Sequence, residues 1–313
     1  MLGFDHIDTI YCKENEIKWL NAPGCNSGSV MQYITAALIQ VAAVEDFNLS
    51  EKTIGIIGVG NVGQKVHTVA EVLGMNVLLN DPPRERIEGG NAFCDLERIK
   101  NESDIISFHV PLNREGADKT YHLADDEFFN QLIKKPTIIN SSRGEVIKTS
   151  SLIDAIKSNK INKTVIDVWE NEPDINLKLL DLVDIATPHI AGYSIDGKAN
   201  GTAVCVNAVN IYFNLGLEEN WYPSEIPIPD DGIELCVNGN KKEVQDIISE
   251  VVNSTYNMVD DNMKFKESPD TFEKQRGNYP VRREFFNYII NLHNCDNIIP
   301  EMLDKMNFKI NFN

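Results

Sequence analysis

A glycine-rich turn after an apolar run is the feature that most constrains the fold of this chain. The run Thr53–Ile57 is unbroken and rich in β-branched residues, and the turn after it reads Gly58-Val59-Gly60-Asn61-Val62-Gly63. Such a run suits a strand buried on both faces. The first glycine allows a tight bend, the second lets the backbone approach a pyrophosphate, and the third permits close packing of a helix on the strand. The segment therefore predicts a dinucleotide site at a helix N-terminus, where unpaired N–H groups favour phosphate.

Strand-like runs alternate with helical patterns through residues 53–187. Besides Thr53–Ile57, the strands that we expect are Asn76–Leu79, Ile105–Val110, Thr137–Asn140, Thr164–Val168 and Ile185–Thr187. The helices expected between them lie near Val62–Leu73, Asp125–Ile133 and Ser150–Ser158, and two longer ones, over Asn26–Phe47 and Ser194–Leu215, flank the unit. This alternation predicts an α/β fold with a parallel, doubly wound sheet.

Asp81 closes the second expected strand, 18 residues after Gly63. A carboxylate at this place meets the ribose hydroxyls of the adenosine and repels a 2′-phosphate, so the sequence predicts NAD in preference to NADP. Two alternatives stay open. The turn can be a glycine turn without a ligand, with Asp81 exposed. Arg84 also brings a cation near the adenosine, which either tolerates NADP or packs beside the adenine or its phosphates.

Polar side chains follow three later strands of the expected sheet, where an open α/β sheet binds its ligands. Arg143, Glu172 and His189 each lie just beyond one of these strands. An arginine can hold a substrate carboxylate with two hydrogen bonds. A histidine can exchange the proton of a hydroxyl group, and a neighbouring carboxylate favours the charged imidazole and orients it. Oxidation of a 2-hydroxy acid by hydride transfer requires these groups.

Each of the three residues also has a structural interpretation. An arginine before glycine is commonly a turn residue, a glutamate before proline commonly caps a helix, and a histidine after proline is commonly a satisfied loop residue. One site explains all three positions together, which three separate structural roles do not. Glu170 competes with Glu172 for the place beside His189, and the position before proline favours Glu172.

The order of these motifs resembles that of the D-2-hydroxyacid dehydrogenases. The resemblance runs through Gly3-Phe-Asp-His-Ile-Asp8, the glycine turn, Asp81-Pro-Pro-Arg84, His109-Val-Pro-Leu112, Asp167-Val-Trp-Glu170 and His189-Ile-Ala-Gly-Tyr193. The tail segment Phe272–Phe285 resembles one branch of the family. That branch implies NAD-dependent oxidation of 4-phospho-D-erythronate at its 2-hydroxyl group, in vitamin B6 biosynthesis. The alternatives are another D-2-hydroxyacid dehydrogenase, of the phosphoglycerate or glyoxylate type, and a catalytically silent NAD-responsive binding protein.

The resemblance implies a role for individual residues of this sequence. It places Arg143 and Glu172 in the active site and makes His189 the proton donor. It places the cofactor at Gly58, Gly60, Asn61, Val62, Gly63, Asp81, Asp167 and Gly192. It places the substrate at Tyr193, with the backbone amides of Leu2 and Gly3 at its carboxylate.

The resemblance also implies a domain organisation. Residues 1–26 would be a remnant of a flavodoxin-like substrate domain, and 27–193 a Rossmann NAD-binding domain with a leading crossover helix. Residues 194–221 would be the returning helix of the substrate domain, and 222–313 a small α/β dimerisation domain, so we expect a homodimer. In the family, strand–helix units precede the loop that begins at Gly3, so we expect this sequence to lack roughly 60 residues of the substrate domain.

Three arginines cluster in the tail, at Arg276, Arg282 and Arg283. A phosphorylated substrate is close to a dianion, and a chain of net charge −18 needs a local group of cations to attract it. One interpretation is that the tail binds the substrate phosphate. The other is a solvated helix start, in which the arginines pair with Glu273 and Glu284.

Composition excludes several other classes of function. The excess of 47 acidic over 29 basic residues argues against binding of nucleic acid or of an anionic membrane surface. The longest apolar stretch, Ile34–Val44, is too short to span a bilayer. The six cysteines form no C-x-x-C pair, so we expect no metal site, no disulfide framework and a reducing, cytoplasmic compartment.

Overall fold

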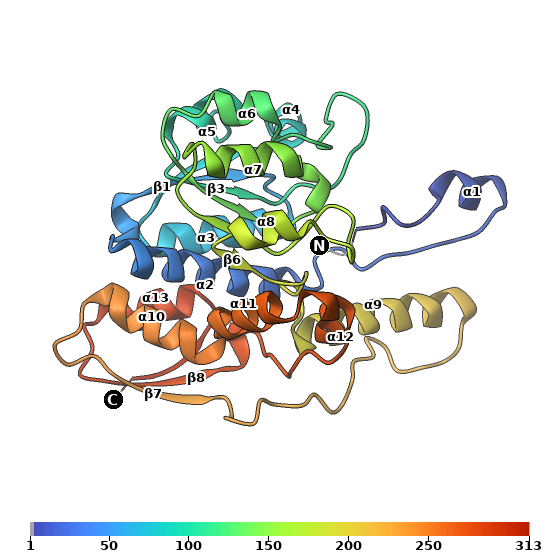
Figure 1. Cartoon of the computed structure of the whole chain (residues 1–313). Coiled ribbons are helices and arrows are strands. Elements are labelled where there is room, and N and C mark those ends of the chain that lie inside the picture. Colours follow the sequence, from blue (N-terminus) through green and yellow to red (C-terminus); the bar gives the residue numbers. More distant parts are fainter. Residues whose placement is uncertain (1–2, 313) are drawn as a thin grey trace.

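The structure, a computed structural model, describes residues 3–312, and its larger part is built on a six-stranded parallel sheet (Figure 1). The strand order is β2-β1-β3-β4-β5-β6. The strands are β1 (Thr53–Ile57), β2 (Asn76–Asn80), β3 (Ile105–Phe108), β4 (Thr137–Asn140), β5 (Thr164–Ile166) and β6 (Ile185–Ala186). Because β1 lies between β2 and β3, the order reverses there, and ligands of open α/β sheets bind outside the strand ends at such a point.

Helices cover both faces of this sheet, which confirms the doubly wound fold (Figure 1). One face carries α2 (Ser27–Glu45) and α3 (Asn61–Val72). The other carries α5 (Leu96–Glu102), α6 (Asp126–Asn130), α7 (Thr149–Lys157) and α8 (Leu177–Leu182). The short α4 (Pro82–Glu88) follows β2. It begins at Pro82 because of two neighbouring residues. Asp81 caps it with a hydrogen bond from the Arg84 N–H, and proline occupies its first position.

A smaller unit follows, with a second parallel sheet of order β7-β8-β9. Its strands are β7 (Glu234–Asn238), β8 (Ile289–His293) and β9 (Lys309–Phe312). Its helices are α10 (Val244–Thr255), α11 (Met258–Glu267), α12 (Phe272–Gly277) and α13 (Ile298–Lys305). Figure 1 shows these helices between the small sheet and the unit that contains the six-stranded sheet. Apolar residues of α10 and α13, such as Val251 and Leu303, belong to the same hydrophobic core as α2 and α3.

Helix α2 is the centre of that shared core. It is apolar on every side, and Tyr33, Ile34 and Leu38 are fully buried. By length and composition it is the one helix of residues 3–312 that could cross a membrane, yet 83% of its apolar window is buried inside the protein. A helix that is apolar all round and enclosed by its own chain is a core helix.

The expected strands all form, but three of them are shorter than predicted. β3 ends at Phe108, β5 at Ile166 and β6 at Ala186. The residues expected to continue β5 and β6 turn away because the Asp167 side chain binds backbone N–H groups beyond β6. The prediction also missed α4, α5 and α8, which are short helices with weak periodicity.

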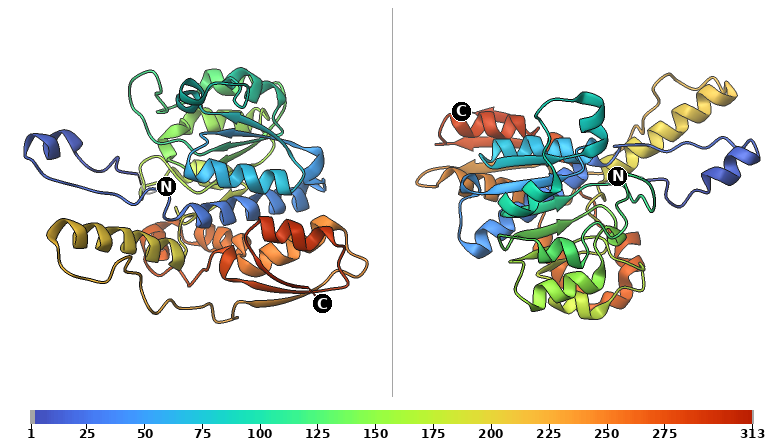
Figure 2. Two further views of the ribbon diagram at one scale, coloured as in Figure 1. Left: turned by 180° about the vertical axis from the view of Figure 1, so that it is seen from behind. Right: turned by 90° about the horizontal axis from the view of Figure 1, so that it is seen from above.

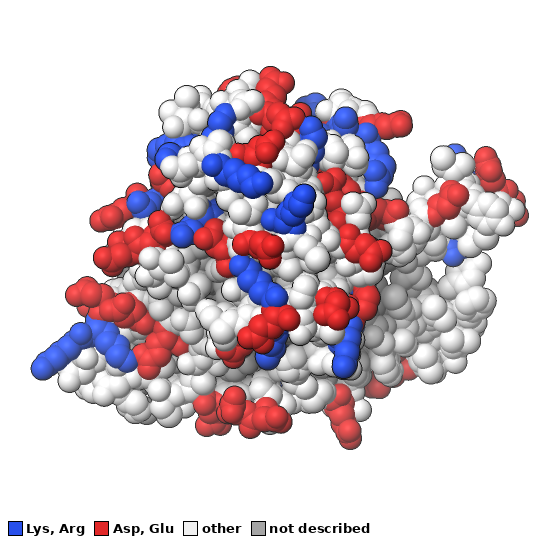
Figure 3. Space-filling model, in the orientation of Figure 1, with Lys and Arg blue, Asp and Glu red and all other residues white. Residues whose placement is uncertain are grey.

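Two segments extend from the body on the same side (Figure 2). One is the N-terminal segment with α1 (Thr9–Glu14), and the other is the far half of α9 (Ile195–Phe213). Only the first half of α9 has buried residues, whereas Ile211, Tyr212 and Phe213 are exposed. On the face shown in Figure 3, acidic and basic side chains are interspersed.

Candidate active site and cofactor site

A cavity of about 470 Å³ lies at the carboxyl ends of β1, β2 and β3, where the strand order reverses. Its lining comes entirely from residues 57–123 and includes Gly58, Gly60, Asn61, Asp81, Pro82, His109, Val110 and Leu123. The position and the mainly apolar wall are typical of a site for a nucleotide cofactor.

The glycines of the turn differ in what surrounds them. Gly58 has a φ of +90°, and a Cβ atom there would lie 2.8 Å from the carbonyl carbon of His109. A Cβ atom on Gly63 would clash with the carbonyl oxygen of Gly58, whereas one on Gly60 would meet nothing within 4 Å. The open space over Gly60 therefore faces the first turn of α3, which begins at Asn61 and buries Val62. This arrangement fits the pyrophosphate of a dinucleotide.

Asp81 connects the glycine turn to the start of α4. Its Oδ2 accepts a hydrogen bond from the Val59 N–H at 2.7 Å, and the carboxylate faces the cavity. The guanidinium of Arg84 donates to the Val59 carbonyl at 2.5 Å and pairs with Glu88 at 2.6 Å. Arg84 is thus neutralised beside the turn, and the negative charge of Asp81 dominates this wall. The residues present fit NAD, with the carboxylate placed for the ribose of the adenosine.

His109 is a neutral part of the cavity wall. Its Nε2 lies 2.8 Å from the Ser107 hydroxyl, and burial lowers the pKa of His109 to about 3. The imidazole is therefore uncharged at neutral pH, so it adds polarity to the wall without adding charge.

A second cavity, of about 300 Å³, lies farther along the same edge of the sheet. Arg143, Asp167, His189, Gly192 and Tyr193 line it together, although they come from the ends of β4, β5 and β6. The rest of the wall is formed by Gly3, His6, Asn26, Val30, Ser141 and Arg276. Gly3 thus lies at the site as expected, and Leu2 lies outside the described residues. Sequence reasoning did not anticipate Asn26, whose amide leaves no room for a Cβ atom on Gly192.

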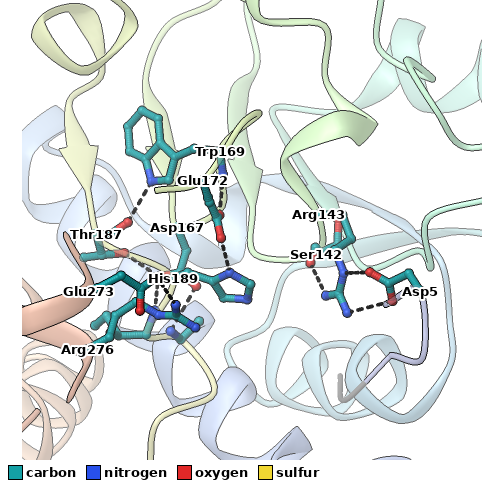
Figure 4. Close-up of polar contacts among 12 residues, drawn as sticks. Asp5, Ser142, Arg143, Asp167, Trp169, Glu172, Thr187, His189, Glu273 and Arg276 are labelled. Atoms are coloured by element: carbon teal, nitrogen blue, oxygen red, sulfur yellow. Dashed lines mark hydrogen bonds and ion pairs between the residues drawn. The ribbon is translucent and has the colours of Figure 1, made fainter. Parts of the chain in front are cut away.

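His189 lines this cavity and pairs with Glu172, which lies behind it and is not among the described residues that line the cavity (Figure 4). The Nδ1 of His189 is 2.7 Å from Glu172 Oε2, and the other oxygen of Glu172 accepts the Trp169 N–H at 2.8 Å. His189 has a φ of +57°, an uncommon conformation for a residue with a side chain. With Nδ1 held by the carboxylate, Nε2 is the nitrogen that can exchange a proton with a substrate.

Glu170, the competing carboxylate, serves a different pair. It lies 2.7 Å from His122 Nε2 and accepts the Thr149 N–H at 2.8 Å. Burial raises the pKa of Glu170, but the hydrogen bonds from Thr149 and His122 outweigh it and hold the pKa below its ordinary value. Neither Glu170 nor His122 is among the described residues that line the 300 Å³ cavity.

Asp167 organises the loop that carries His189. It is 1% exposed, and it accepts hydrogen bonds from the N–H groups of Ile190 and Ala191 at 2.8 and 3.0 Å and from the Thr187 hydroxyl at 2.7 Å. Burial raises the pKa of Asp167 against the lowering effect of these contacts. Asp167 therefore fixes the backbone that directly follows His189, and it also lines the cavity.

Arg143 already binds a carboxylate in this structure. Its Nε and Nη2 donate to the two oxygens of Asp5 at 2.8 and 3.2 Å, and Nη1 donates to the Ser142 carbonyl at 2.7 Å (Figure 4). Burial raises the pKa of Asp5, but the hydrogen bond and charge of Arg143 outweigh it and lower that pKa. The Asp5 carboxylate shows that the Arg143 fork can take a carboxylate with two hydrogen bonds.

For Arg282, both interpretations of the tail are wrong, the phosphate-binding one and the solvated one. It is 4% exposed, so it is neither solvated nor available to a substrate. Its Nη2 donates to the carbonyls of Ile190 and Ala191 at 3.1 and 2.6 Å and to the Ser29 hydroxyl at 2.6 Å. The peptide groups after His189 are thus held by Asp167 through their N–H groups and by Arg282 through their carbonyls.

Arg283 and Arg276 differ in their partners and in their access to the cavity. Arg283 is also buried, paired with Asp196 at 2.9 Å, so the expectation that it binds phosphate is wrong. Glu284 accepts a hydrogen bond from the Ser194 hydroxyl at 2.9 Å and is not the partner of Arg282 or Arg283. Arg276 does pair with Glu273, at 2.8 Å, and it also lines the 300 Å³ cavity. No feature of the sequence distinguishes the three, because their surroundings come from distant segments.

Comparisons with known proteins agree with this geometry. Residues 34–191 match the family described as D-isomer specific 2-hydroxyacid dehydrogenase, NAD binding domain, and residues 233–305 match a domain of unknown function, DUF3410. The chain is 50% identical over 283 residues to the erythronate-4-phosphate dehydrogenase of Bacteroides thetaiotaomicron, covering 90% of this chain and 78% of that protein. It is 45% identical over 285 residues to the enzyme of that name from Porphyromonas gingivalis, covering 90% and 75%.

A solved structure shows the same fold with ligands. The D-lactate dehydrogenase of Aquifex aeolicus, complexed with NAD and lactic acid, superimposes with a TM-score of 0.59 at 29% identity. The match covers 68% of this chain and 74% of that one. The matched family, the two relatives and this fold lead to one conclusion: the chain belongs to the NAD-dependent D-isomer specific 2-hydroxyacid dehydrogenases.

Proposed function

We propose that this protein oxidises 4-phospho-D-erythronate at its 2-hydroxyl group with NAD, giving (R)-3-hydroxy-2-oxo-4-phosphooxybutanoate, a step of vitamin B6 biosynthesis. The observation that carries the proposal is one cavity, at the same edge of the sheet as the nucleotide cavity, that is lined by both Arg143 and His189, with Glu172 bound to His189. The identity of 50% to an erythronate-4-phosphate dehydrogenase favours this substrate over other 2-hydroxy acids.

Each group of the cavity has a part in this reaction. Arg143 holds the substrate carboxylate with the fork that here holds Asp5, which fixes the orientation of the reacting carbon. His189 takes the hydroxyl proton on Nε2, and Glu172 stabilises the imidazolium that forms, because its carboxylate is 2.7 Å from Nδ1. NAD, when bound, supplies the acceptor for the hydride that leaves C2. In the reverse direction the same His189 donates the proton.

The glycine turn, Asn61, Val62 and Asp81 would hold the pyrophosphate and the adenosine end of NAD. Asp167 and Gly192 would lie near its reacting end, since both line the cavity that contains His189. Tyr193 would contact the substrate from the same wall. These assignments are supported by the two cavities, which both lie at the carboxyl ends of strands of the large sheet.

We also propose the domain organisation expected from the sequence, with residues 222–313 as a dimerisation domain in a cytoplasmic homodimer. A parallel sheet is ordinarily covered on both faces. Here the helices of the small unit cover one face of its sheet (Figure 1). Glu234, Cys236 and Asn238 alternate along β7 and are exposed, so they belong to the other face. A second copy could cover that face, and sedimentation measurements test the dimer directly.

The activity is tested by following NADH formation with four acids: 4-phospho-D-erythronate, D-erythronate, 3-phospho-D-glycerate and glycolate. We expect the highest kcat/KM with 4-phospho-D-erythronate. A higher value with 3-phospho-D-glycerate or glycolate would assign the protein to another member of the family. Tight binding of NAD without turnover of any acid would show a silent, NAD-responsive binding protein.

A further inference from the structure

Arg276 is the one tail arginine that reaches the substrate cavity. It comes from α12 in the C-terminal unit, far along the chain from the strand ends that supply Arg143 and His189. In Figure 4, His189 lies between Arg143 on one side and Arg276 on the other. The cavity therefore has a cation on each side of the residue that exchanges the proton.

The guanidinium of Arg276 is held in place but incompletely satisfied. Its Nη1 donates to Glu273 at 2.8 Å, and Glu273 is itself 63% exposed on its side chain. Its Nε is buried and has no hydrogen-bond partner among the described residues. A buried donor without a partner costs free energy. The Arg276 side chain as a whole is 21% exposed and lines the cavity, so it is accessible to an anion there.

Aromatic rings fix where this cation lies. Arg276 stacks 5.4 Å from the ring centre of Tyr193 and 5.6 Å from that of Phe272. The Nζ of Lys198 lies 4.8 Å from the same Tyr193 ring, so two cations flank the residue at the cavity wall. Such contacts orient a guanidinium without consuming its hydrogen-bond donors.

The substrate of the proposed function carries one anion at each end. Its carboxylate is next to the reacting carbon, and its phosphate is at the far end of a four-carbon chain. Arg143 takes the carboxylate, which leaves the phosphate for a cation on the other side of His189. Arg282 and Arg283 are buried in other contacts, so they do not supply it.

We propose that Arg276 binds the substrate phosphate and thereby sets the preference for a phosphorylated 2-hydroxy acid, with Lys198 adding positive charge nearby. The proposal rests on the proposed function for the identity of the acid. On this view the C-terminal unit contributes a specificity residue to the active site, in addition to its packing on α2.

The test compares 4-phospho-D-erythronate with D-erythronate, which lacks only the phosphate. We measure kcat and KM for both acids, and binding of both to the NADH-loaded protein by calorimetry, in the wild type, Arg276→Ala, Arg276→Lys and Lys274→Ala. Lys274 is the matched control, because it is an exposed cation of the same helix that does not line the cavity.

For Arg276→Ala we expect kcat/KM for the phosphorylated acid to fall by about 10- to 100-fold, mainly through KM, because a charged hydrogen-bond donor is lost. The values for D-erythronate should change less than about twofold. Arg276→Lys should restore part of the loss, since lysine keeps the charge but not the fork. Lys274→Ala should behave as the wild type.

Equal losses for both acids in Arg276→Ala, or no loss for either, would overturn the proposal. Equal binding of the two acids by the wild type would overturn it as well. A wild type that binds the phosphorylated acid more tightly, loses this preference in Arg276→Ala and yet oxidises neither acid would support the phosphate subsite and refute the proposed function.

Discussion

The two cavities at the edge of the large sheet are built in opposite ways. The nucleotide cavity is lined by one continuous stretch of chain, residues 57–123. The substrate cavity is lined by the N-terminal segment, the ends of β4, β5 and β6, and α12 of the C-terminal unit. The first site is built within three consecutive strands and the segments that follow them, whereas the second exists only after distant segments have packed together.

The difference extends to how the residues are supported. Gly58, Gly63 and Asp81 are all held by contacts within residues 57–123: Gly58 packs against His109, Gly63 against Gly58, and Asp81 binds the Val59 N–H. The loop after His189 is held by Asp167 on one side and by Arg282 of the C-terminal unit on the other. Changes in the two regions should therefore separate cofactor affinity from turnover.

The largest effect is expected for His189→Ala. Turnover should fall by ~10²–10⁴-fold, the usual contribution of a positioned acid–base group, while the affinity for NAD measured by calorimetry stays nearly unchanged. His122→Ala is the matched control, because His122 also pairs with a glutamate but does not line the cavity. Near-native turnover in the His189 variant, or an equal loss in the His122 variant, would break the distinction between the two regions.

Arg282→Met tests how strongly the His189 loop of the substrate cavity depends on the C-terminal unit. Methionine keeps an unbranched apolar side chain but leaves the Ile190 and Ala191 carbonyls without their charged donor, which should lower the free energy of unfolding by about 2–3 kcal/mol. We also expect kcat to fall while the affinity for NAD is kept, because only the loop after His189 is loosened.

Denaturant unfolding and steady-state kinetics measure both effects of Arg282→Met. Arg98→Met is the control, since Arg98 forms an exposed ion pair with Glu102 that should contribute little. If the Arg282 variant retains full stability and full kcat, the C-terminal unit does not support the His189 loop.

The free energy of unfolding should depend on pH because of His109, which lines the nucleotide cavity. Because the pKa of buried His109 is about 3 against an ordinary 6.5, the unfolded chain binds a proton that the folded chain does not. Its contribution to stability is complete above pH 6.5 and is lost as the pH falls toward 3, at about 1.4 kcal/mol per pH unit. Lowering the pH from 7.5 to 5 should therefore cost about 2 kcal/mol through this group.

His109→Gln isolates that contribution, because all other titrating groups are shared with the wild type. Unfolding by denaturant at the two pH values should show a smaller loss of stability in the variant, by about 2 kcal/mol. The same loss in both proteins would mean that His109 does not titrate as its burial requires.

The smallest effect concerns the choice of cofactor. Asp81→Asn keeps an acceptor for the Val59 N–H but removes the charge, so the preference for NAD over NADP should fall by about tenfold. Asp118→Asn is the control, because Asp118 lines the same cavity but is paired with Arg86. Calorimetry with both cofactors measures the ratio, and a wild type that binds NADP as tightly as NAD would show that Arg84 dominates this wall.

Much of the NAD-binding fold was predictable, because its signals are local. β1 and β4 have the predicted bounds. The glycine turn was predictable because the strand before it and the helix after it are adjacent in the chain. The short helices α5 and α8 were missed because they bury only a few residues each. The predicted β5 and β6 were too long because side-chain hydrogen bonds from Asp167 redirect the chain there.

The sequence by itself determined the parallel sheet, the dinucleotide turn and the order in which Arg143, Glu172 and His189 arrive at one edge, since strand direction and turn chemistry follow from neighbouring residues. The structure confirms the preference for Glu172 over Glu170 as the partner of His189, which the position before proline had favoured. Only the tertiary structure decided that Arg276 reaches the cavity while Arg282 is buried beneath the His189 loop. The reason is physical. The surroundings of these charged side chains are made by segments far apart in sequence, and burial and hydrogen bonding there exist only in the packed molecule.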